Sequence, residues 1–434
     1  MYRDVSKLIL YGDLGENSIL GNLASVFADW EAGRTDKSRL VRRIYDQVKR
    51  LLDLGTDYGF DANLWENYLT FLIMMNENSF SLTAERQGAQ DGSVNHFAKN
   101  DFAVFQRLFH FDFRPIEEDL GIDCFTTLTQ YRAIEKRERR YNKTVSEKVR
   151  ALSRALSAAR DEEAFFRIVT EFYRQWGVGL FGLNRAFRIR GSGDDLEFIP
   201  IHNLTGARLS DLVGYELQKK ELRHNTEAFI SGRRANNVLL YGDSGTGKSS
   251  SVKALLNEYY DQGLRMIEIY KHQFQELSQV IAATKHRNYA FIILIDDLSF
   301  EEDEVEYKFL KAVIEGGVET KPDNVLIYAT SNRRHLIRET WKDRNDMEHN
   351  GDVHRSDTVE EKLSLSSRFG VQINYSTPNR GLFQEIVTEL ARREGLDVDQ
   401  EILLAEANKW ELHHGGISGR TAQQFINYLA GKLR

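Results

Sequence analysis

One segment near the middle of the chain has the residue types of a loop that binds phosphate groups. Residues 242–249 read GDSGTGKS and fit the pattern G-x-x-x-x-G-K-[ST]. Glycines let the backbone curl so that successive N–H groups point at phosphate oxygens, and the lysine reaches the outer phosphates. The final hydroxyl can bind Mg²⁺. The pattern therefore predicts an ATP site in which Lys248 contacts the β- and γ-phosphates and Ser249 contacts the metal.

Two adjacent aspartates further along the chain complete this chemistry. Asp296 and Asp297 directly follow residues 291–295, which are all apolar. A carboxylate at the end of a strand beside the phosphate loop can hold Mg²⁺, usually through water. A second carboxylate there can polarise the attacking water as a general base. We expect Asp296 to be the metal ligand and Asp297 the base, because two merely solvated aspartates would not explain their spacing from the loop.

The elements that must position these residues alternate between strands and helices. Five segments are apolar and rich in β-branched residues, and helical segments separate them. Strands that are apolar throughout are typical of a parallel sheet covered on both faces. The first strand leads into the phosphate loop, and residues 250–260 after the loop read as a helix, which is the context that such a loop requires. The expected strands are residues 237–241, 265–270, 291–295, 324–329 and 371–375.

The N-terminal part of the chain reads mainly as helices. Residues 38–54 place apolar side chains three and four positions apart, which is typical of an amphipathic helix. Residues 83–101 are polar and contain glycine, so we expect a loop or an exposed excursion there. The turn-rich segment 191–195 marks the expected domain boundary. The predicted domains are a mainly α-helical N-terminal domain (1–190), an α/β nucleotide-binding core (191–376) and a helical C-terminal lid (377–434).

Four further segments resemble motifs of the AAA+ ATPases. The sequence LVGY at residues 212–215 precedes the loop by about one helix, as the adenine-contacting segment does in that superfamily. Residues 330–332 (TSN) follow an apolar strand and look like the sensor-1 motif, with Asn332 as the polar sensor. The resemblance implies an AAA+ P-loop NTPase fold with a parallel sheet and a small C-terminal helical lid.

The other two segments carry arginines. Residues 366–370 (SSRFG) resemble the arginine-finger segment, in which Arg368 would reach the ATP of a neighbouring subunit. Residues 416–420 (GISGR) resemble the sensor-2 motif, with Arg420 facing the γ-phosphate. The resemblance therefore implies a homo-oligomer with ATP between its subunits. The charged segment 342–361 before the finger is either a surface excursion or a loop that reaches the neighbouring subunit.

The loop and the resemblance together give a set of expected site residues. The expected catalytic residues are Lys248, Asp297, Asn332, Arg368 and Arg420. The expected cofactors are ATP and Mg²⁺, and the expected metal ligands are Ser249 and Asp296. The residues expected to bind the nucleotide are Leu212, Val213, Gly214, Gly242, Asp243, Ser244, Gly245, Thr246, Gly247, Lys248, Ser249 and Ser250.

The sequence is more similar still to one bacterial family of predicted AAA+ ATPases of unknown function. This similarity covers about residues 177–434, whereas the N-terminal region matches only in its helical character. It therefore implies a fold and a chemistry but no substrate. The segments that carry it are residues 177–187 (GVGLFGLNRAF), 209–215 (LSDLVGY), 329–336 (ATSNRRHL) and 357–370 (DTVEEKLSLSSRFG).

Two departures from the superfamily pattern leave two functions open. Asp297 stands where many AAA+ proteins have glutamate, and no aromatic-apolar-glycine pore loop follows the strand at 265–270. The first hypothesis is an oligomeric Mg²⁺-dependent ATPase that couples ATP binding or hydrolysis to conformational change on a macromolecular partner. The alternative is a slowly hydrolysing ATP-dependent switch or scaffold that recruits protein or DNA. Threading of a protein through a ring pore is less expected than either.

Composition and charge limit the binding partners and the cellular location that we expect for the protein. The 434 residues carry a formal net charge of −7, so a global attraction to nucleic acid is not implied. A basic cluster at residues 132–140, interleaved with Glu135 and Glu138, keeps nucleic acid open as a minor alternative to an unidentified protein client. The single cysteine, Cys124, excludes an intramolecular disulfide. The N-terminal segment is a poor signal peptide and the apolar runs are too short to span a bilayer, so we expect a cytoplasmic protein.

Overall fold

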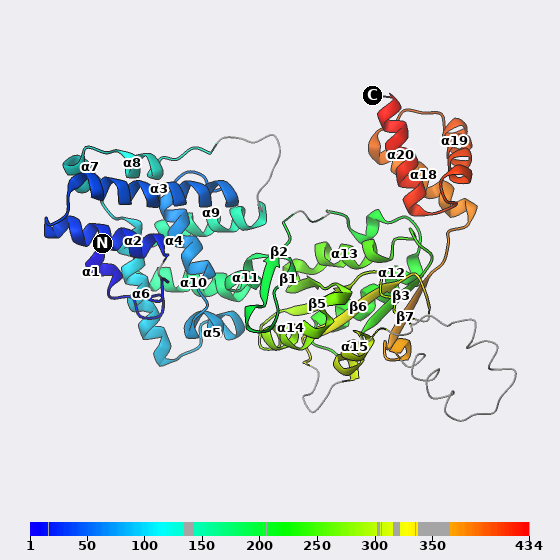
Figure 1. Cartoon of the computed structure of the whole chain (residues 1–434), viewed down its shortest axis with the longest axis horizontal. Helices are drawn as coiled ribbons and strands as arrows, with labels where there is room; N and C mark the ends of the chain where they lie inside the picture. Colours follow the sequence, from blue (N-terminus) through cyan, green and yellow to red (C-terminus); the bar gives the residue numbers. More distant parts are fainter. Residues whose placement is uncertain are drawn as a thin grey trace. The chain divides into compact units, whose positions relative to one another are not determined.

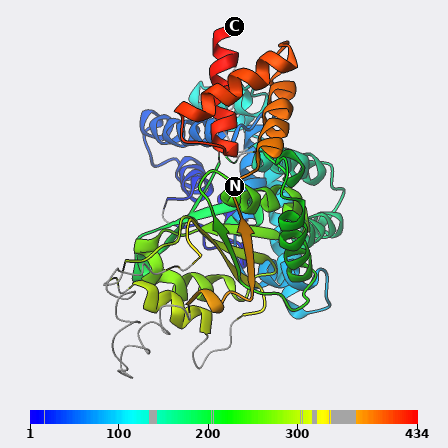
Figure 2. The ribbon, with the colours of Figure 1, turned by 90° about the vertical axis from the view of Figure 1, so that its right-hand side faces the viewer.

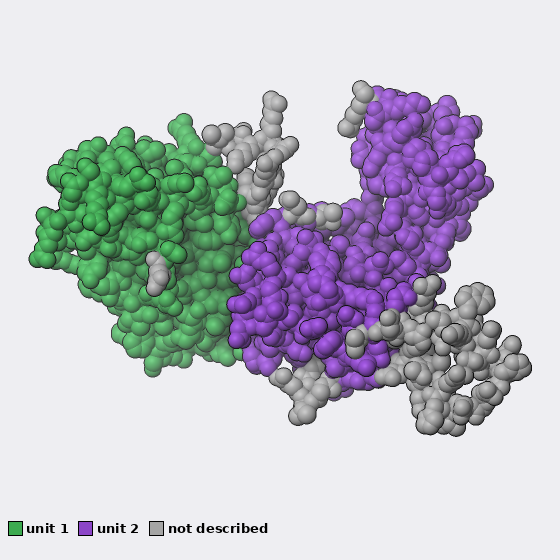
Figure 3. Space-filling model, viewed as in Figure 1, with its two compact units in different colours: residues 1–184 green, residues 185–434 purple. Residues whose placement is uncertain are grey.

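The chain forms two compact units, Met1–Asn184 and Arg185–Arg434, which Figure 3 shows in different colours. The structure is a computed structural model, and it describes residues 1–434 except 16, 134–142, 203, 205, 302, 303, 305, 316–321, 335, 337–364 and 434. The charged segment 342–361 and most of the basic cluster at 132–140 therefore lie outside the described residues.

The first unit consists of helices packed around an apolar core. The helix expected at residues 38–54 is confirmed as α3, which buries Leu40, Ile44 and Leu51 along one face. The side chain of Asp36 caps its start by accepting a hydrogen bond from the backbone N–H of Arg39. The helices, in blue to cyan in Figure 1, are α1 (Tyr2–Val5), α2 (Ile19–Ala32), α3 (Lys37–Tyr58), α4 (Leu64–Met75), α5 (Ser79–Gln87), α6 (Ser93–Phe109), α7 (Arg114–Leu120), α8 (Cys124–Thr129), α9 (Lys143–Ser157), α10 (Glu162–Trp176) and α11 (Gly179–Leu183).

The prediction of a loop or an exposed excursion at residues 83–101 is wrong, because the helices α5 and α6 cover most of this segment. Asn78 and Ser81 form a capping box at the start of α5. In α6, Ala98 and Phe102 are buried, whereas Asn100 is exposed and Lys99 is partly exposed. Asp101 is buried as well, because its carboxylate accepts hydrogen bonds from backbone N–H groups near the N-terminus of the chain. The polar composition of this segment is therefore that of an amphipathic helix.

The second unit is built around a seven-stranded sheet. Its order is β2-β1-β4-β5-β6-β3-β7, and all neighbouring strands are parallel except for the antiparallel pair β1–β2. The five expected strands are present with small shifts at their ends, so the mostly parallel α/β fold is confirmed. The strands are β1 (Ala186–Arg190), β2 (Glu197–Pro200), β3 (Val238–Gly242), β4 (Leu264–Glu268), β5 (Ala290–Ile295), β6 (Val325–Ser331) and β7 (Val371–Tyr375).

Two short strands, β1 and β2, were not expected from the sequence. Residues 191–195, expected as a domain boundary, lie in the turn between them. The chain divides instead at Asn184, because β1 already belongs to the sheet, where Ala186 pairs with Met266 of β4. The sequence AFRIR of β1 contains two exposed arginines on either side of a buried isoleucine, so it lacks the continuous apolar character of the inner strands.

Helices cover both faces of the sheet, as Figure 1 and Figure 2 show from two directions. Helices α12 (Glu216–Ile230) and α13 (Lys248–Tyr259) lie on one side, where Leu222 and Leu255 share a core with Leu240 of β3. Helices α14 (Leu277–Thr284) and α15 (Glu306–Glu315) lie on the other side. The inner strands are apolar throughout because both of their faces are buried.

Three helices follow β7 and pack on one another as the small C-terminal helical lid that was expected. They are α18 (Arg380–Glu394), α19 (Gln400–His413) and α20 (Gly419–Leu433), and their common core includes Phe383 and Phe425. In the part of the chain that the structure describes, no helix has the length and apolar character needed to cross a membrane.

Candidate functional site

The phosphate loop connects β3, an inner strand of the sheet, to α13. At Gly242 the backbone φ is 130°, and a Cβ there would lie 2.2 Å from the carbonyl oxygen of Tyr375. Gly247, with a φ of 94°, precedes the first turn of α13, and no atom lies within 4 Å of where its Cβ would be. Glycine therefore permits a close passage beside β7 at one end of the loop, and it leaves the backbone accessible to a ligand at the N-terminus of the helix.

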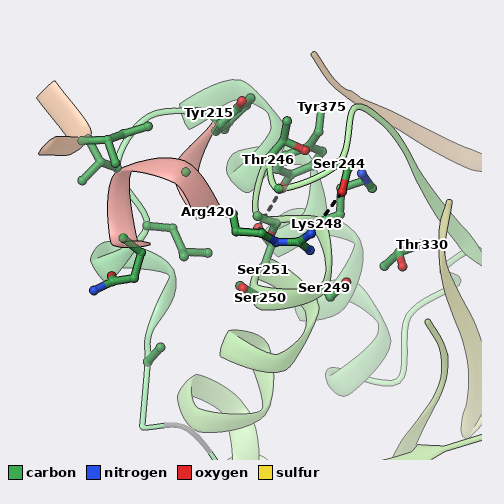
Figure 4. Close-up of a pocket in the computed structure, with 18 of the residues that line it drawn as sticks. Tyr215, Ser244, Thr246, Lys248, Ser249, Ser250, Ser251, Thr330, Tyr375 and Arg420 are labelled. Carbon is green, nitrogen blue, oxygen red and sulfur yellow. Dashed lines mark hydrogen bonds between the residues drawn. The ribbon is translucent and has the colours of Figure 1, made fainter. Parts of the chain in front are cut away.

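The ammonium group of Lys248 lies inside the curl of this loop (Figure 4). Its Nζ donates hydrogen bonds to the carbonyl oxygens of Gly242 and Asp243 at 2.8 and 2.6 Å, and to Oδ1 of Asn332 at 3.1 Å. Burial lowers the pKa of Lys248, and the charges of nearby aspartates oppose this shift. A partly buried cation among loop carbonyls is suited to exchange these partners for phosphate oxygens.

Asp296, at the end of β5, reaches the first turn of α13. Its Oδ1 accepts hydrogen bonds from the hydroxyls of Ser249 and Thr330, and its Oδ2 lies 3.5 Å from Nζ of Lys253. Burial alone would raise the pKa of Asp296, but the two hydroxyl hydrogen bonds and the charge of Lys253 together lower it. The structure thus brings both predicted metal ligands, Ser249 and Asp296, into direct contact as a hydroxyl and an ionised carboxylate.

Asp297 has an unusual backbone conformation. Its φ of 55° is in the left-handed region, which few residues other than glycine adopt. Its backbone N–H donates to Oγ1 of Thr330 at 3.0 Å, and its Oδ1 accepts a hydrogen bond from Nδ2 of Asn332 at 2.8 Å. Asn332 therefore connects the predicted base to Lys248 through its two amide atoms, and it fixes the direction of the Asp297 carboxylate.

These polar groups line a cavity of about 710 Å³ that is also lined by apolar side chains. Leu212 and Val213 come from the segment before α12, and Ile386 and Leu390 come from α18 of the lid. The cavity has the size and the mixed lining of a small-molecule site. One ligand with an apolar ring system and a polyanionic group would match both kinds of lining.

An aromatic pair also borders the cavity. Tyr215 stacks on Tyr375 with ring centroids 5.0 Å apart and planes at 28°, and the hydroxyl of Tyr375 donates to Oγ of Ser251 at 3.0 Å. Tyr375 is the last residue of a strand, and Ile386 and Leu390 are four residues apart on a helix. From the sequence alone, such residues are expected to be buried, but nothing in the pattern indicates that they contact a ligand. Tyr215 and Thr330 also line the cavity and belong to predicted segments, although neither was assigned a role of its own from the sequence. The lining residues outside the predicted segments include Tyr375, Ile386, Leu390, Arg393 and Gln423.

Arg420 joins the lid to the phosphate loop. Its backbone N–H donates to the carbonyl oxygen of Gly245 at 3.2 Å, and its Nη1 donates to Oγ of Ser244 at 3.5 Å. Its side chain lines the cavity together with Lys248, as Figure 4 shows. The predicted sensor-2 arginine therefore lies beside the loop, on the first turn of α20.

Some of the predicted site residues do not line this cavity. Gly214 lines a neighbouring groove instead of this cavity. The carboxylate of Asp243 accepts hydrogen bonds from the backbone N–H and hydroxyl of Thr377, at 2.8 and 2.7 Å. Arg368 forms an ion pair with Glu315, at the end of α15, and is not among the residues that line the cavity. The structure therefore gathers the loop, the aspartates, Asn332 and Arg420, but it does not bring in Arg368.

The donor set fits Mg²⁺ bound together with a nucleotide. Within the described ranges, no group of three or more His, Cys, Asp or Glu side chains could hold a metal ion by itself. Ser249 and Asp296 offer two adjacent oxygens, so a cation at this place would need further oxygens from phosphates and water. Mg²⁺ keeps several waters and commonly binds through one carboxylate and substrate phosphates.

A phosphate loop follows an inner strand, an aspartate pair ends another strand of the sheet, and a helical lid lies against the loop. This is the arrangement that the resemblance to the AAA+ ATPases predicted. Residues 183–433 match the family described as "Protein of unknown function (DUF815)". Because the match covers more than half of the chain, the chain belongs to this family. A search of curated proteins found no significant match.

Solved structures show distant similarity. A point variant of RuvB from Thermotoga maritima is 15% identical over 52% of this chain and 65% of that chain, with a TM-score of 0.37. The T. maritima RuvB structure described as a Holliday junction branch migration motor has the same identity and coverage, with a TM-score of 0.36. The AAA domain of FIGL-1 in complex with ADP is 17% identical over 53% of this chain and 75% of that chain, with a TM-score of 0.37. The match to RuvB thus spans just under two thirds of that chain.

Proposed function

We propose that this protein is a Mg²⁺-dependent ATPase that works as a homo-oligomer and couples ATP binding or hydrolysis to a conformational change on a macromolecular partner. The observation that carries the proposal is the path of hydrogen bonds from Lys248 through Asn332 to Asp297. These residues share one cavity with Ser249 and Asp296. The arrangement combines a phosphate ligand, a candidate metal site and a candidate base.

Each group has a role in this proposal. The N–H groups of the loop and Lys248 bind the phosphates, while Leu212 and Val213 contact the base of the nucleotide. Mg²⁺, when bound, neutralises negative charge on the phosphate oxygens. Asp297 orients the attacking water and accepts its proton, and Asn332 holds the carboxylate of Asp297 in place.

The position of Arg368 supports a role in trans. Its guanidinium is paired with Glu315 and is outside the lining of the cavity of its own subunit. In a homo-oligomer it would face the γ-phosphate of a neighbouring subunit after leaving Glu315. An arginine supplied in this way stabilises charge in the transition state and raises turnover by about 10³–10⁵-fold.

The test separates ATP binding from turnover. Lys248→Ala should abolish binding of a fluorescent ATP analogue, because the loop loses its cation. Arg368→Ala should spare binding and lower phosphate release at least about 10³-fold. Lys49→Ala and Arg39→Ala, both on the exposed face of α3, serve as matched controls. Full turnover in Arg368→Ala would refute the role in trans, and normal ATP binding in Lys248→Ala would refute the site.

A slowly hydrolysing switch is the second candidate. Asp297 favours it, because its side chain is one methylene shorter than glutamate and is already held by Asn332. In this version ATP stabilises a conformation that recruits a protein, or less expectedly DNA, and hydrolysis resets it. Phosphate release with and without candidate partners, combined with sizing in a slowly hydrolysed ATP analogue, distinguishes the two. Tight ATP binding and assembly with barely measurable turnover would favour the switch.

A further inference from the structure

A charged network extends from Asp296 to the neighbouring strand β4. Lys253 lies one helical turn after Ser249 on α13, so both side chains are on the same face of the helix. Its Nζ is 3.5 Å from Oδ2 of Asp296 and 3.4 Å from Oε1 of Glu268, the last residue of β4. One ammonium group is therefore shared almost equally between two carboxylates.

Glu268 has a second cationic partner on its other side. Its Oε2 accepts a hydrogen bond from Nε of Arg188 on β1 at 2.8 Å, and the hydroxyl of Tyr270 lies 3.4 Å away. The Glu268 side chain is 10% exposed, whereas that of Lys253 is 41% exposed. The carboxylate is thus fixed in place, and the lysine has the flexible stem and the space to move.

We propose that Lys253 is a positioning residue that competes with Mg²⁺ for Asp296, and that Glu268 holds the lysine away when the metal binds. The inference rests on the proposed function, because the cation is that of the Mg²⁺–ATP complex. A doubly charged ion beside Asp296 repels an ammonium only a few ångströms away. Glu268 supplies the alternative partner, so the lysine can move without leaving a charge unpaired.

This competition predicts opposite effects on metal dependence. In Lys253→Met the competitor is lost, so the Mg²⁺ concentration for half-maximal binding of a slowly hydrolysed ATP analogue should fall about three- to tenfold. In Glu268→Gln the lysine pairs with Asp296 alone, so the same concentration should rise by a similar factor. Lys253→Arg retains the charge and should stay close to the wild type.

The double variant separates competition from a simple field effect. If the three charges act independently through space, Lys253→Met and Glu268→Gln should largely cancel when combined. If Glu268 acts by holding Lys253, the double variant should behave like Lys253→Met, because no lysine remains to be held. The binding titration is an equilibrium measurement and does not depend on turnover.

A further variant, together with a check of folding, keeps the test decisive if one of the other variants fails to fold. Arg188 is half exposed, and Arg188→Gln should leave Glu268 with more attraction for Lys253, so the half-maximal Mg²⁺ concentration should fall. Thermal unfolding establishes that each variant is folded. Equal metal dependence in all folded variants, or cancellation in the double variant, would overturn the competition while ATP binding stands. Failure of the wild type to bind the analogue at any Mg²⁺ concentration would instead overturn the proposed function, and this inference with it.

Discussion

At the scale of single residues, the most informative position is Asp297. A left-handed backbone at a residue other than glycine costs about 1–3 kcal/mol and persists only where its surroundings hold it. Thr330 and Asn332 do so here, by hydrogen bonds to the backbone and to the carboxylate. The backbone strain is therefore located at the residue that we propose as the base, and Asn332 fixes the direction in which its carboxylate points.

Asp297→Asn tests this role with little disturbance of the fold. Asparagine tolerates the left-handed conformation, and its side-chain oxygen can still accept the hydrogen bond from Asn332. We expect unchanged binding of an ATP analogue and a loss of phosphate release of about 10²–10⁴-fold, the usual contribution of a general base. Asp91→Asn, on the surface of the first unit, is the control. Retained turnover in Asp297→Asn would assign the base elsewhere.

At the scale of elements, the phosphate loop is supported from two sides. Asp243 accepts two hydrogen bonds from Thr377, just after β7, and the carbonyl oxygen of Gly245 accepts one from Arg420 of the lid. The loop is thus connected by hydrogen bonds both to the end of β7 and to the lid. The side chain of Asp243, predicted to bind nucleotide, contributes to the shape of the loop.

This support should be sensitive to acid. Hydrogen bonds from the side chain and backbone of Thr377 lower the pKa of Asp243 below its ordinary value of 3.8. The stabilisation is therefore complete above that value and is lost as pH falls through the lower pKa of the folded protein. Asp243→Asn should lower Tm near neutral pH, and the difference from the wild type should narrow below about pH 4. Thr377→Val should give the same pattern, whereas a difference that is constant with pH would contradict it.

The sequence predicted those parts of the site that are continuous in the chain. The loop, the aspartate pair and the helical periodicity of the lid all follow local patterns of residue type. Tyr375 and Ile386 were missed because an apolar or aromatic residue at the end of a strand or on a helix indicates burial, not which cavity it borders. β1 was missed because two exposed arginines interrupt its apolar residues, and α6 because its polar residues dominate its composition.

At the scale of the whole molecule, the chain has separate hydrophobic cores in its two units. The core of the first includes Phe102 and Phe165, and that of the second includes Leu240 and Leu255. The phosphate loop, the aspartates and the lid all belong to the second unit. A ligand that binds the site should therefore stabilise one unit directly.

Calorimetry can detect this division. We expect two unfolding transitions, of which Mg²⁺ with a slowly hydrolysed ATP analogue raises only one. At a free ligand concentration of about 100 times Kd, the gain in unfolding free energy is about 2.7 kcal/mol. Lys248→Ala should keep both transitions and lose the shift. A single transition that moves as a whole would show that the two units unfold together.

The three hydrogen bonds of Lys248 have a consequence for ligand selectivity. They go to two carbonyl oxygens of the loop and to Asn332, so all donors of the ammonium group have protein acceptors. A ligand must offer an equally strong acceptor before the lysine releases them, and the β- and γ-phosphates are the groups that we expect Lys248 to contact. Adenosine and AMP lack both phosphates and would leave the lysine with its present partners. The site should therefore bind ADP and ATP in preference to AMP and adenosine.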